Sequence, residues 1–91
     1  PFGAGNPQPV FLTKNLLVSE MRLVGVNNKH VALKLISPEN KPMDAIGFNL
    51  SDKVGEIRIG DRIDSVYTVD REVWKGNVKY KLKMKDFRVN E

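Results

Sequence analysis

The residues best placed to do chemistry are four lysines that alternate with apolar residues near the end of the chain. They are Lys79, Lys81, Lys83 and Lys85. A β-strand repeats every two residues, so the run predicts a strand with these lysines on one face and Val78, Tyr80, Leu82 and Met84 on the other. Same-face residues on a strand lie roughly 6.5–7 Å apart, which is close to the phosphate spacing of an extended single strand. The pattern indicates a surface that could contact a nucleic-acid backbone. A solvated strand face without a ligand is the alternative.

A tryptophan near the predicted turn could add base stacking to this surface. Trp74 lies between Arg71 and Lys75 in the sequence. An exposed aromatic ring flanked by cations can stack on a base, which is worth ~1–3 kcal/mol per base, while the cations contact phosphates. The alternative is that Trp74 folds back onto the protein and closes the hairpin. Lys34, on the polar face of an earlier strand, completes the predicted nucleic-acid-binding set of Lys34, Arg71, Trp74, Lys75, Lys79, Lys81, Lys83 and Lys85.

Catalytic chemistry is not indicated. A two-metal phosphodiesterase needs clustered Asp and His ligands that hold ions roughly 3.5–4 Å apart. The chain has one histidine and no cysteine, and His30 is expected on the surface at the start of a strand. Asp61, Asp64 and Asp86 are expected to be turn and strand-end acids. The sequence contains no phosphate-binding loop and no nucleophile–base pair. It therefore predicts no catalytic residue, no metal site, no cofactor and no enzyme activity for this chain by itself.

The composition is that of one small globular domain. The chain has 91 residues, 41% of them hydrophobic and 29% charged, and a formal net charge of +4. Gly60 to Asn90 holds eight basic and five acidic residues, so three of the four net charges lie there. No apolar run approaches ~18 residues and no signal peptide opens the chain, so we expect a cytoplasmic protein without a membrane partner. Pro1 lacks an initiator Met, and the Gly/Pro-rich start suggests a domain cut from a longer protein.

The order of predicted elements favours a small β-barrel. Residues 1–9, with three prolines, form an expected inter-domain joint, and residues 10–91 form the domain. Strands are expected over 10–24, with a break near Lys14 and Asn15, and over 30–36, 43–48, 62–69 and 78–85. Asn49 or Ser51 could cap a short helical turn that Gly55 ends. Gly60-Asp61 and Gly76-Asn77 are expected in turns.

Five strands with one helical turn between the third and fourth predict an all-β fold, a five-stranded OB-fold Greek-key barrel. An SH3-like barrel is the alternative, but its helical turn normally precedes the last strand. The expected core includes Val31, Leu33 and Leu35, together with Phe11, Phe48 and Phe87. Leu17, Met21 and Leu23 are expected on one face of their strand. Tyr67 and Tyr80 are expected in the core or at a barrel end. Gly47, inside a strand, suggests a bulge or a sharp coil.

The chain also resembles a known family. Pro1-Phe-Gly-Ala-Gly-Asn-Pro-Gln-Pro-Val-Phe11 is similar to the PFGxGNPxPxF segment of RecJ-type single-stranded-DNA-specific exonucleases. The stretches Asp44–Phe48, Gly60–Asp64, Val73–Gly76 and Leu82–Asp86 resemble further blocks of that family in the same order. Lys75 stands where an Asn or a similar polar residue is expected.

The resemblance implies the C-terminal OB-fold domain of such an enzyme, whose catalytic DHH domain and DHHA1 domain precede it. It further implies a parent 5'-3' single-stranded-DNA exonuclease, a hydrolase of DNA repair and recombination that would use Mn²⁺ or Mg²⁺. The expected partners are single-stranded DNA and the DHH and DHHA1 domains of the same chain. We expect binding that is weak, independent of sequence and sensitive to salt. The alternative function is a protein-docking module that packs on the nuclease core or on another repair protein.

Overall fold

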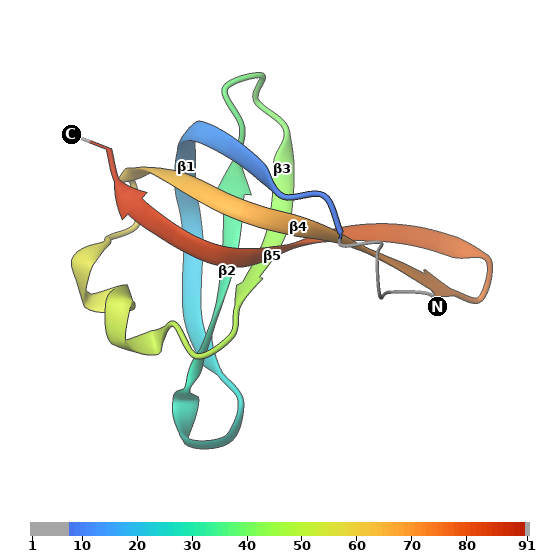
Figure 1. Cartoon of the computed structure of the whole chain (residues 1–91), viewed down its shortest axis with the longest axis horizontal. Coiled ribbons are helices and arrows are strands. Elements are labelled where there is room, and N and C mark those ends of the chain that lie inside the picture. The colour runs from blue at the N-terminus through green and yellow to red at the C-terminus, as the bar shows by residue number, and fades with distance from the viewer. Residues whose placement is uncertain (1–7, 91) are drawn as a thin grey trace.

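A computed structural model describes residues 8–90, in which five strands form most of the molecule (Figure 1). The strands are β1 (Phe11–Val24), β2 (His30–Ile36), β3 (Pro42–Gly47), β4 (Arg62–Trp74) and β5 (Asn77–Val89). Two short 3-10 helices join them, η1 (Val26–Asn28) and η2 (Ser51–Glu56). The predicted joint over residues 1–9 lies, apart from its last two residues, outside the described part of the chain. No helix within residues 8–90 is long and apolar enough to cross a membrane.

The strands close into a barrel in the order β1-β2-β3-β5-β4. β1 pairs antiparallel with β2 and β4, β2 with β3, and β4 with β5, whereas the contact of β3 with β5 is parallel. The helical insert η2 lies between the third and fourth strands. This is the strand order of an OB-fold, so the predicted fold class is confirmed.

The barrel interior is filled by one apolar cluster of Leu16, Val18, Val31, Leu33, Leu35, Ala45, Ile57, Ile63, Leu82, Met84 and Phe87. β2 shows how the sequence produces it, because buried Val31, Leu33 and Leu35 alternate with half-buried residues. The core positions predicted for this strand and for Phe87 are confirmed. The two faces of β2 therefore differ in their surroundings. The inner face holds the core, and the outer face is available to a ligand.

β1 is interrupted twice, and only one interruption was predicted. Its register with β4 shifts between Thr13 and Leu16, and Asn15 has a φ of 61°, which confirms the break near Lys14 and Asn15. A second shift, in the pairing with β2, makes Ser19 an extra residue. An extra residue reverses the inside–outside alternation, so Leu17 faces away from the side that carries Met21. The predicted shared face of Leu17, Met21 and Leu23 was therefore wrong for Leu17.

The β4–β5 hairpin is longer than the barrel and projects from it (Figure 1). Tyr80 is consequently 61% exposed, so its predicted place in the core or at a barrel end was wrong. Phe11 and Phe48 were also wrongly predicted as core residues, since each ends up near half-exposed at a strand end. Tyr67 does lie at the barrel end: it packs against the core, stacks on Phe11 and shares a hydrogen bond of 2.8 Å between its hydroxyl and that of Thr13.

The segment between β3 and β4 differs from the prediction in detail. No side chain caps η2, which runs through Gly55 to Glu56 and is followed by buried, extended Ile57. Both the predicted caps and the predicted stop were therefore wrong. Gly47 ends β3 without a bulge. A Cβ atom at Gly47 would lie 2.8 Å from Leu50 Cδ1, so this glycine permits the close approach of the chain that follows.

Candidate nucleic-acid interface

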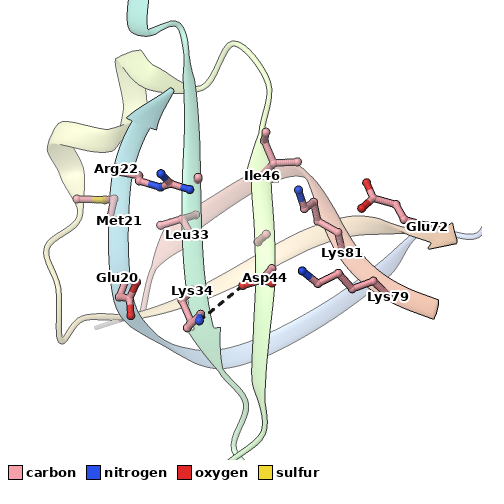
Figure 2. A pocket seen from close by; sticks show the side chains of 12 residues that line it. Glu20, Met21, Arg22, Leu33, Lys34, Asp44, Ile46, Glu72, Lys79 and Lys81 are labelled. Carbon is pink, nitrogen blue, oxygen red and sulfur yellow. Dashed lines mark ion pairs between the residues drawn. The ribbon is translucent and has the colours of Figure 1, made fainter. Parts of the chain in front are cut away.

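The outer face of the sheet forms a groove of about 380 Å³ (Figure 2). Its walls come from β1, β2, β3 and the start of the projecting hairpin, the face that OB-folds use for oligonucleotides. The lining residues are Glu20, Met21, Arg22, Ala32, Leu33, Lys34, Asp44, Ala45, Ile46, Glu72, Lys79 and Lys81. Figure 2 shows Lys79 and Lys81 reaching from β5 toward β3, while Arg22 and Lys34 approach from β1 and β2. Three of the predicted lysines, namely Lys34, Lys79 and Lys81, therefore meet in one groove.

Acidic residues alternate with the lysines across the middle of this groove. The cross-strand register places Glu20, Lys34, Asp44, Lys81 and Asp70 in one row over β1, β2, β3, β5 and β4. Within the row, Lys34 Nζ lies 4.0 Å from Asp44 Oδ1. An exposed pair of this kind contributes about 0–1 kcal/mol to stability. Its main effect is on the surface potential, because each lysine of the row has an acid beside it.

The groove is consequently only mildly basic. Four cationic and three acidic side chains line it, so its formal charge is one positive unit. Lys79, the groove lysine nearest the hairpin tip, lies directly opposite Glu72. This charge is smaller than the four β5 lysines alone suggested.

The four β5 lysines do not form one continuous row. Lys79 and Lys81 line the groove, and Lys83 lies farther along, with its Nζ 5.5 Å from the centroid of the Phe48 ring. Lys85 is the extra residue of a bulge, since Met84 pairs with Tyr67 and Asp86 with Val66. Lys85 is exposed at that bulge and does not line the groove.

Trp74 is 72% exposed at the hairpin tip, so the alternative in which it folds back onto the barrel is excluded. It pairs with Asn77, and the two-residue period places it on the same face as Lys79 and Lys81. Lys75 Nζ lies 5.6 Å from the centroid of the tryptophan ring. Arg71 pairs with Tyr80 and therefore belongs to the opposite face of the hairpin. The structure joins Lys75 to the tryptophan and separates Arg71 from it.

Phe48 is a candidate that the sequence analysis missed. It follows β3 on the outer face, is 45% exposed and lies beneath Lys83. His30 packs against it in a T-shaped arrangement with ring centroids 5.0 Å apart, and His30 Nδ1 accepts a 2.9 Å hydrogen bond from the Asn49 N–H. His30, expected as a plain surface residue, thus supports the ring. The signal was present, because Asp44, Ile46 and Phe48 alternate on one face of the strand. Arg22, which alternates with Glu20 in the same way, was also missed.

The acids expected at turns and strand ends have structural partners. Asp61 accepts the Arg58 N–H, and Asp86 forms an ion pair with Lys53 and accepts the Phe87 N–H. The Lys53 hydrogen bond, followed by that of Phe87, lowers the pKa of the Asp86 carboxyl below its ordinary value. Within residues 8–90, no three His, Cys, Asp or Glu side chains gather as metal ligands. The groove and the hairpin face beside it therefore offer a ligand cations and exposed aromatic rings.

Comparison with known proteins agrees with this arrangement. The sequence model of the RecJ OB domain family matches residues 1–86. The chain belongs to the RecJ OB domain family. The single-stranded-DNA-specific exonuclease RecJ of Bacillus subtilis (strain 168) is 34% identical to it over 91 residues. This alignment covers 100% of the chain but 12% of that relative, so the RecJ OB domain described here spans a small part of the relative's length.

Solved structures place the RecJ OB domain among similar barrels. RecJ from Thermus thermophilus, in complex with Mn²⁺, has a TM-score of 0.66 and 25% identity, with 100% of this chain and 12% of that chain covered. The mitochondrial single-stranded DNA binding protein Rim1 of S. cerevisiae has a TM-score of 0.72 and 15% identity, with 90% and 95% covered. A small single-stranded DNA-binding protein from Streptomyces coelicolor has a TM-score of 0.71 and 6% identity, with 92% and 94% covered. At these identities the last two establish the shared fold.

Proposed function

We propose that this RecJ OB domain binds single-stranded DNA on the groove face for a nuclease whose catalytic part lies elsewhere in a longer chain. The observation that carries the proposal is the groove itself, where Lys79 and Lys81 converge with Arg22 and Lys34 between two exposed aromatic residues. Cations that follow a backbone together with rings that stack on bases are the recurring means of binding single strands. The 34% identical relative is a single-stranded-DNA-specific exonuclease, which supports the same conclusion.

The chemistry of the face predicts weak binding with little sequence preference. Phosphate contacts carry no sequence information, and stacking accepts every base because every base has a π-face. A duplex hides these base faces inside its own stack, so an unpaired strand is the ligand that can use the aromatic residues. The small positive charge of the groove keeps the affinity of the isolated domain low.

The proposal extends to the parent protein. We propose a single-strand-specific exonuclease of DNA repair and recombination, with 5'-3' polarity, in the cytoplasm. Its DHH and DHHA1 domains would precede this domain and use Mn²⁺ or Mg²⁺. The support is the family membership and the opening segment Pro1–Phe11, which is similar to the segment that follows those domains in RecJ-type exonucleases.

A pair of matched charge reversals tests where DNA binds. Lys79→Glu places a new negative charge in the groove, whereas Arg58→Glu makes the same change of net charge on the link between η2 and β4. The anisotropy of a labelled oligothymidylate at about 50 mM salt measures the affinity. We expect Lys79→Glu to weaken binding by about tenfold and Arg58→Glu to change it by less than about twofold. Equal weakening by both variants would show that the affinity for DNA depends on the net charge of the domain and not on the groove.

Docking onto the nuclease core is the second candidate function, and the opposite face of the projecting hairpin favours it. Val73, Val78 and Tyr80 are 47–61% exposed there. Val73 pairs with Val78, so their side chains form one apolar patch on the hairpin. The occupant we propose is the catalytic part of the same parent chain, because the matched region makes up 12% of the relative's length and the remainder would be joined to it covalently. The two candidates use opposite faces and are compatible.

A further inference from the structure

We propose that the groove face holds a single strand mainly by its bases, at two aromatic–lysine pairs, and not mainly by phosphates along the lysine strand. The pairs are Phe48 with Lys83 and Trp74 with Lys75. This inference rests on the proposed function, since it assumes that unpaired nucleic acid binds this face. It names the part of the ligand that is recognised, which is the exposed face of a nucleobase.

The row of alternating charges from Glu20 to Asp70 argues against a binding mode in which contacts to phosphates supply most of the affinity. A phosphate placed over Lys34 or Lys81 also lies beside Asp44, which separates these two lysines in the row. Attraction and repulsion then act over similar distances in a water-filled groove, where each is weak. Because Lys79 is likewise opposite Glu72, three lysines that looked available from the sequence have an acid as a cross-strand neighbour.

The two aromatic–lysine pairs lie outside this row, in which each lysine has an acid beside it. The Phe48 ring is held by its T-shaped contact with His30, which is itself held by the Asn49 N–H, so little ordering remains to be done when a base arrives. Lys83 lies over the ring, and an exposed cation–π contact is weaker than a base–aromatic stack. An arriving base can therefore displace the flexible lysine, whose ammonium then reaches the phosphate of the same nucleotide.

The spacing of the pairs suits a short single strand. Trp74 is level with Asn77 on β5, and Gly47, which precedes Phe48, is level with Met84. Seven residues of strand separate those levels, which corresponds to about 23 Å. At about 6–7 Å per nucleotide, the two rings would bracket roughly four nucleotides, at the lower end of the range for OB-folds.

An abasic strand separates the two modes, because it keeps the phosphates and removes the bases. The 91-residue chain is titrated with an oligothymidylate of about 12 nucleotides and with an abasic strand of equal phosphate number. Trp74 is the one tryptophan of the chain, so its fluorescence reports stacking directly, alongside the anisotropy of the labelled strand. We expect the abasic strand to bind at least about tenfold more weakly and to leave the fluorescence unchanged.

Matched variants locate the stacking sites. Phe48→Leu should weaken oligothymidylate binding by roughly five- to hundredfold, whereas Phe11→Leu, an equally exposed phenylalanine away from the groove, should leave it unchanged. Trp74→Leu is paired in the same way with Tyr80→Leu on the opposite face of the hairpin. The hairpin tip lies outside the core, so this second pair remains informative if Phe48→Leu disturbs folding.

The salt dependence gives an independent readout. Phosphate contacts by Lys75 and Lys83 alone predict a slope of log affinity against log salt of about −1.4, whereas contacts by four β5 lysines predict about −2.8. Equal binding of abasic and thymidylate strands, with the steeper slope, would overturn the inference and leave the proposed function standing. Failure of the intact chain to bind the oligothymidylate at all would overturn both.

Discussion

Asp64 shows how much one side chain can organise in a small barrel. Its carboxylate accepts hydrogen bonds from the Asn15 N–H at 3.1 Å, from Asn90 Nδ2 at 3.0 Å and from Arg88 Nε at 3.2 Å. The side chain is 7% exposed. These partners come from the break in β1 and from the end of β5, so Asp64 holds together two segments at opposite ends of the sequence.

The surroundings of Asp64 make stability depend on pH. The Asn15 N–H, then Arg88 and Asn90, lower the pKa of its carboxyl, and they outweigh the burial that alone would raise it. The pKa of Asp86 is lowered as well. An acid whose pKa is lower in the folded state stabilises the fold above its unfolded pKa of about 3.9, and this contribution is lost as the pH falls through the folded value. We expect the melting temperature to fall steadily below about pH 4.

Replacement of Asp64 tests this assignment. Asp64→Asn removes the charge that the three donors stabilise, so it should lower the melting temperature at pH 7 by several degrees and flatten its dependence on acid pH. Asp52→Asn, an exposed acid in η2, serves as the control and should keep the slope of the parent chain. Thermal melts followed by circular dichroism across this pH range give the answer. An unchanged slope in Asp64→Asn would assign the acid sensitivity to other carboxyls.

Residue roles of this kind could be predicted only in part. The Gly60–Asp64 block indicated strand-end acids, and Asp64 does lie near the start of β4. Its donors, however, come from distant parts of the chain, and no local pattern brings them together. Phe48 was missed for a different reason. Its aromatic type suggested the core, and this expectation outweighed the alternation with Asp44 that placed it outside.

Among the elements, the β4–β5 hairpin combines a favourable length with an unfavourable turn residue. Lys75 and Gly76 form its two-residue turn, with φ angles of 50° and 82°. Positive φ at both positions defines a type I′ turn, for which Asn-Gly is the preferred sequence. Gly76 meets this preference at no steric cost, but Lys75 carries a side chain that makes the left-handed region unfavourable.

Lys75→Asn should therefore stabilise the hairpin while weakening its binding of DNA. Asn tolerates the left-handed region better, so we expect a gain of about 0.5–1 kcal/mol in the free energy of unfolding. The same change removes the cation beside Trp74, so oligothymidylate affinity should fall by about twofold to fivefold. Denaturant unfolding and anisotropy titration on one preparation measure both effects. A loss of stability would mean that the contact of Lys75 with the tryptophan outweighs the backbone preference.

The strands themselves were predictable because their alternation is strong, and the bulges were not. Val31, Leu33 and Leu35 alternate with polar or small residues, and the structure follows that pattern. Ser19 and Lys85 are extra residues within their strands, yet neither is a glycine or a proline that would mark a bulge. A bulge depends on the partner strand, so a single strand read alone carries the alternation past it. This is why Lys85 was placed in line with Lys81 and Lys83.

For the whole molecule, the proposed function makes a kinetic prediction about the parent enzyme. Deletion of this domain should leave the chemical step in place and weaken substrate capture, raising KM by about tenfold while kcat falls by less than about threefold. The reason is that contacts on this face hold the ground state and the transition state equally, and such uniform binding acts on KM. Steady-state exonuclease assays of the full-length and truncated chains on single-stranded DNA measure both parameters.

The opposite result would support the second candidate function. A truncated enzyme with unchanged KM and a collapsed kcat would mean that the domain supports the catalytic core through contacts such as the apolar patch of Val73, Val78 and Tyr80. Full-length chains carrying Val78→Lys or Lys79→Glu separate the two roles within the intact parent. The first changes the apolar face of the hairpin, and the second changes the groove.

The projecting hairpin also bears on how the protein could aggregate. The pairing of β4 with β1 stops at Tyr67 and that of β5 with β3 starts at Lys81, so within residues 8–90 the hairpin beyond these points has an unpaired edge on either side. Such edges, beside exposed Val73 and Val78, are templates on which another chain could add a strand. Arg71, Glu72, Lys75 and Lys79 lie along this segment and oppose such an approach by their charge and hydration. We therefore expect variants that neutralise these residues, or solutions of high ionic strength, to promote aggregation that begins at the hairpin.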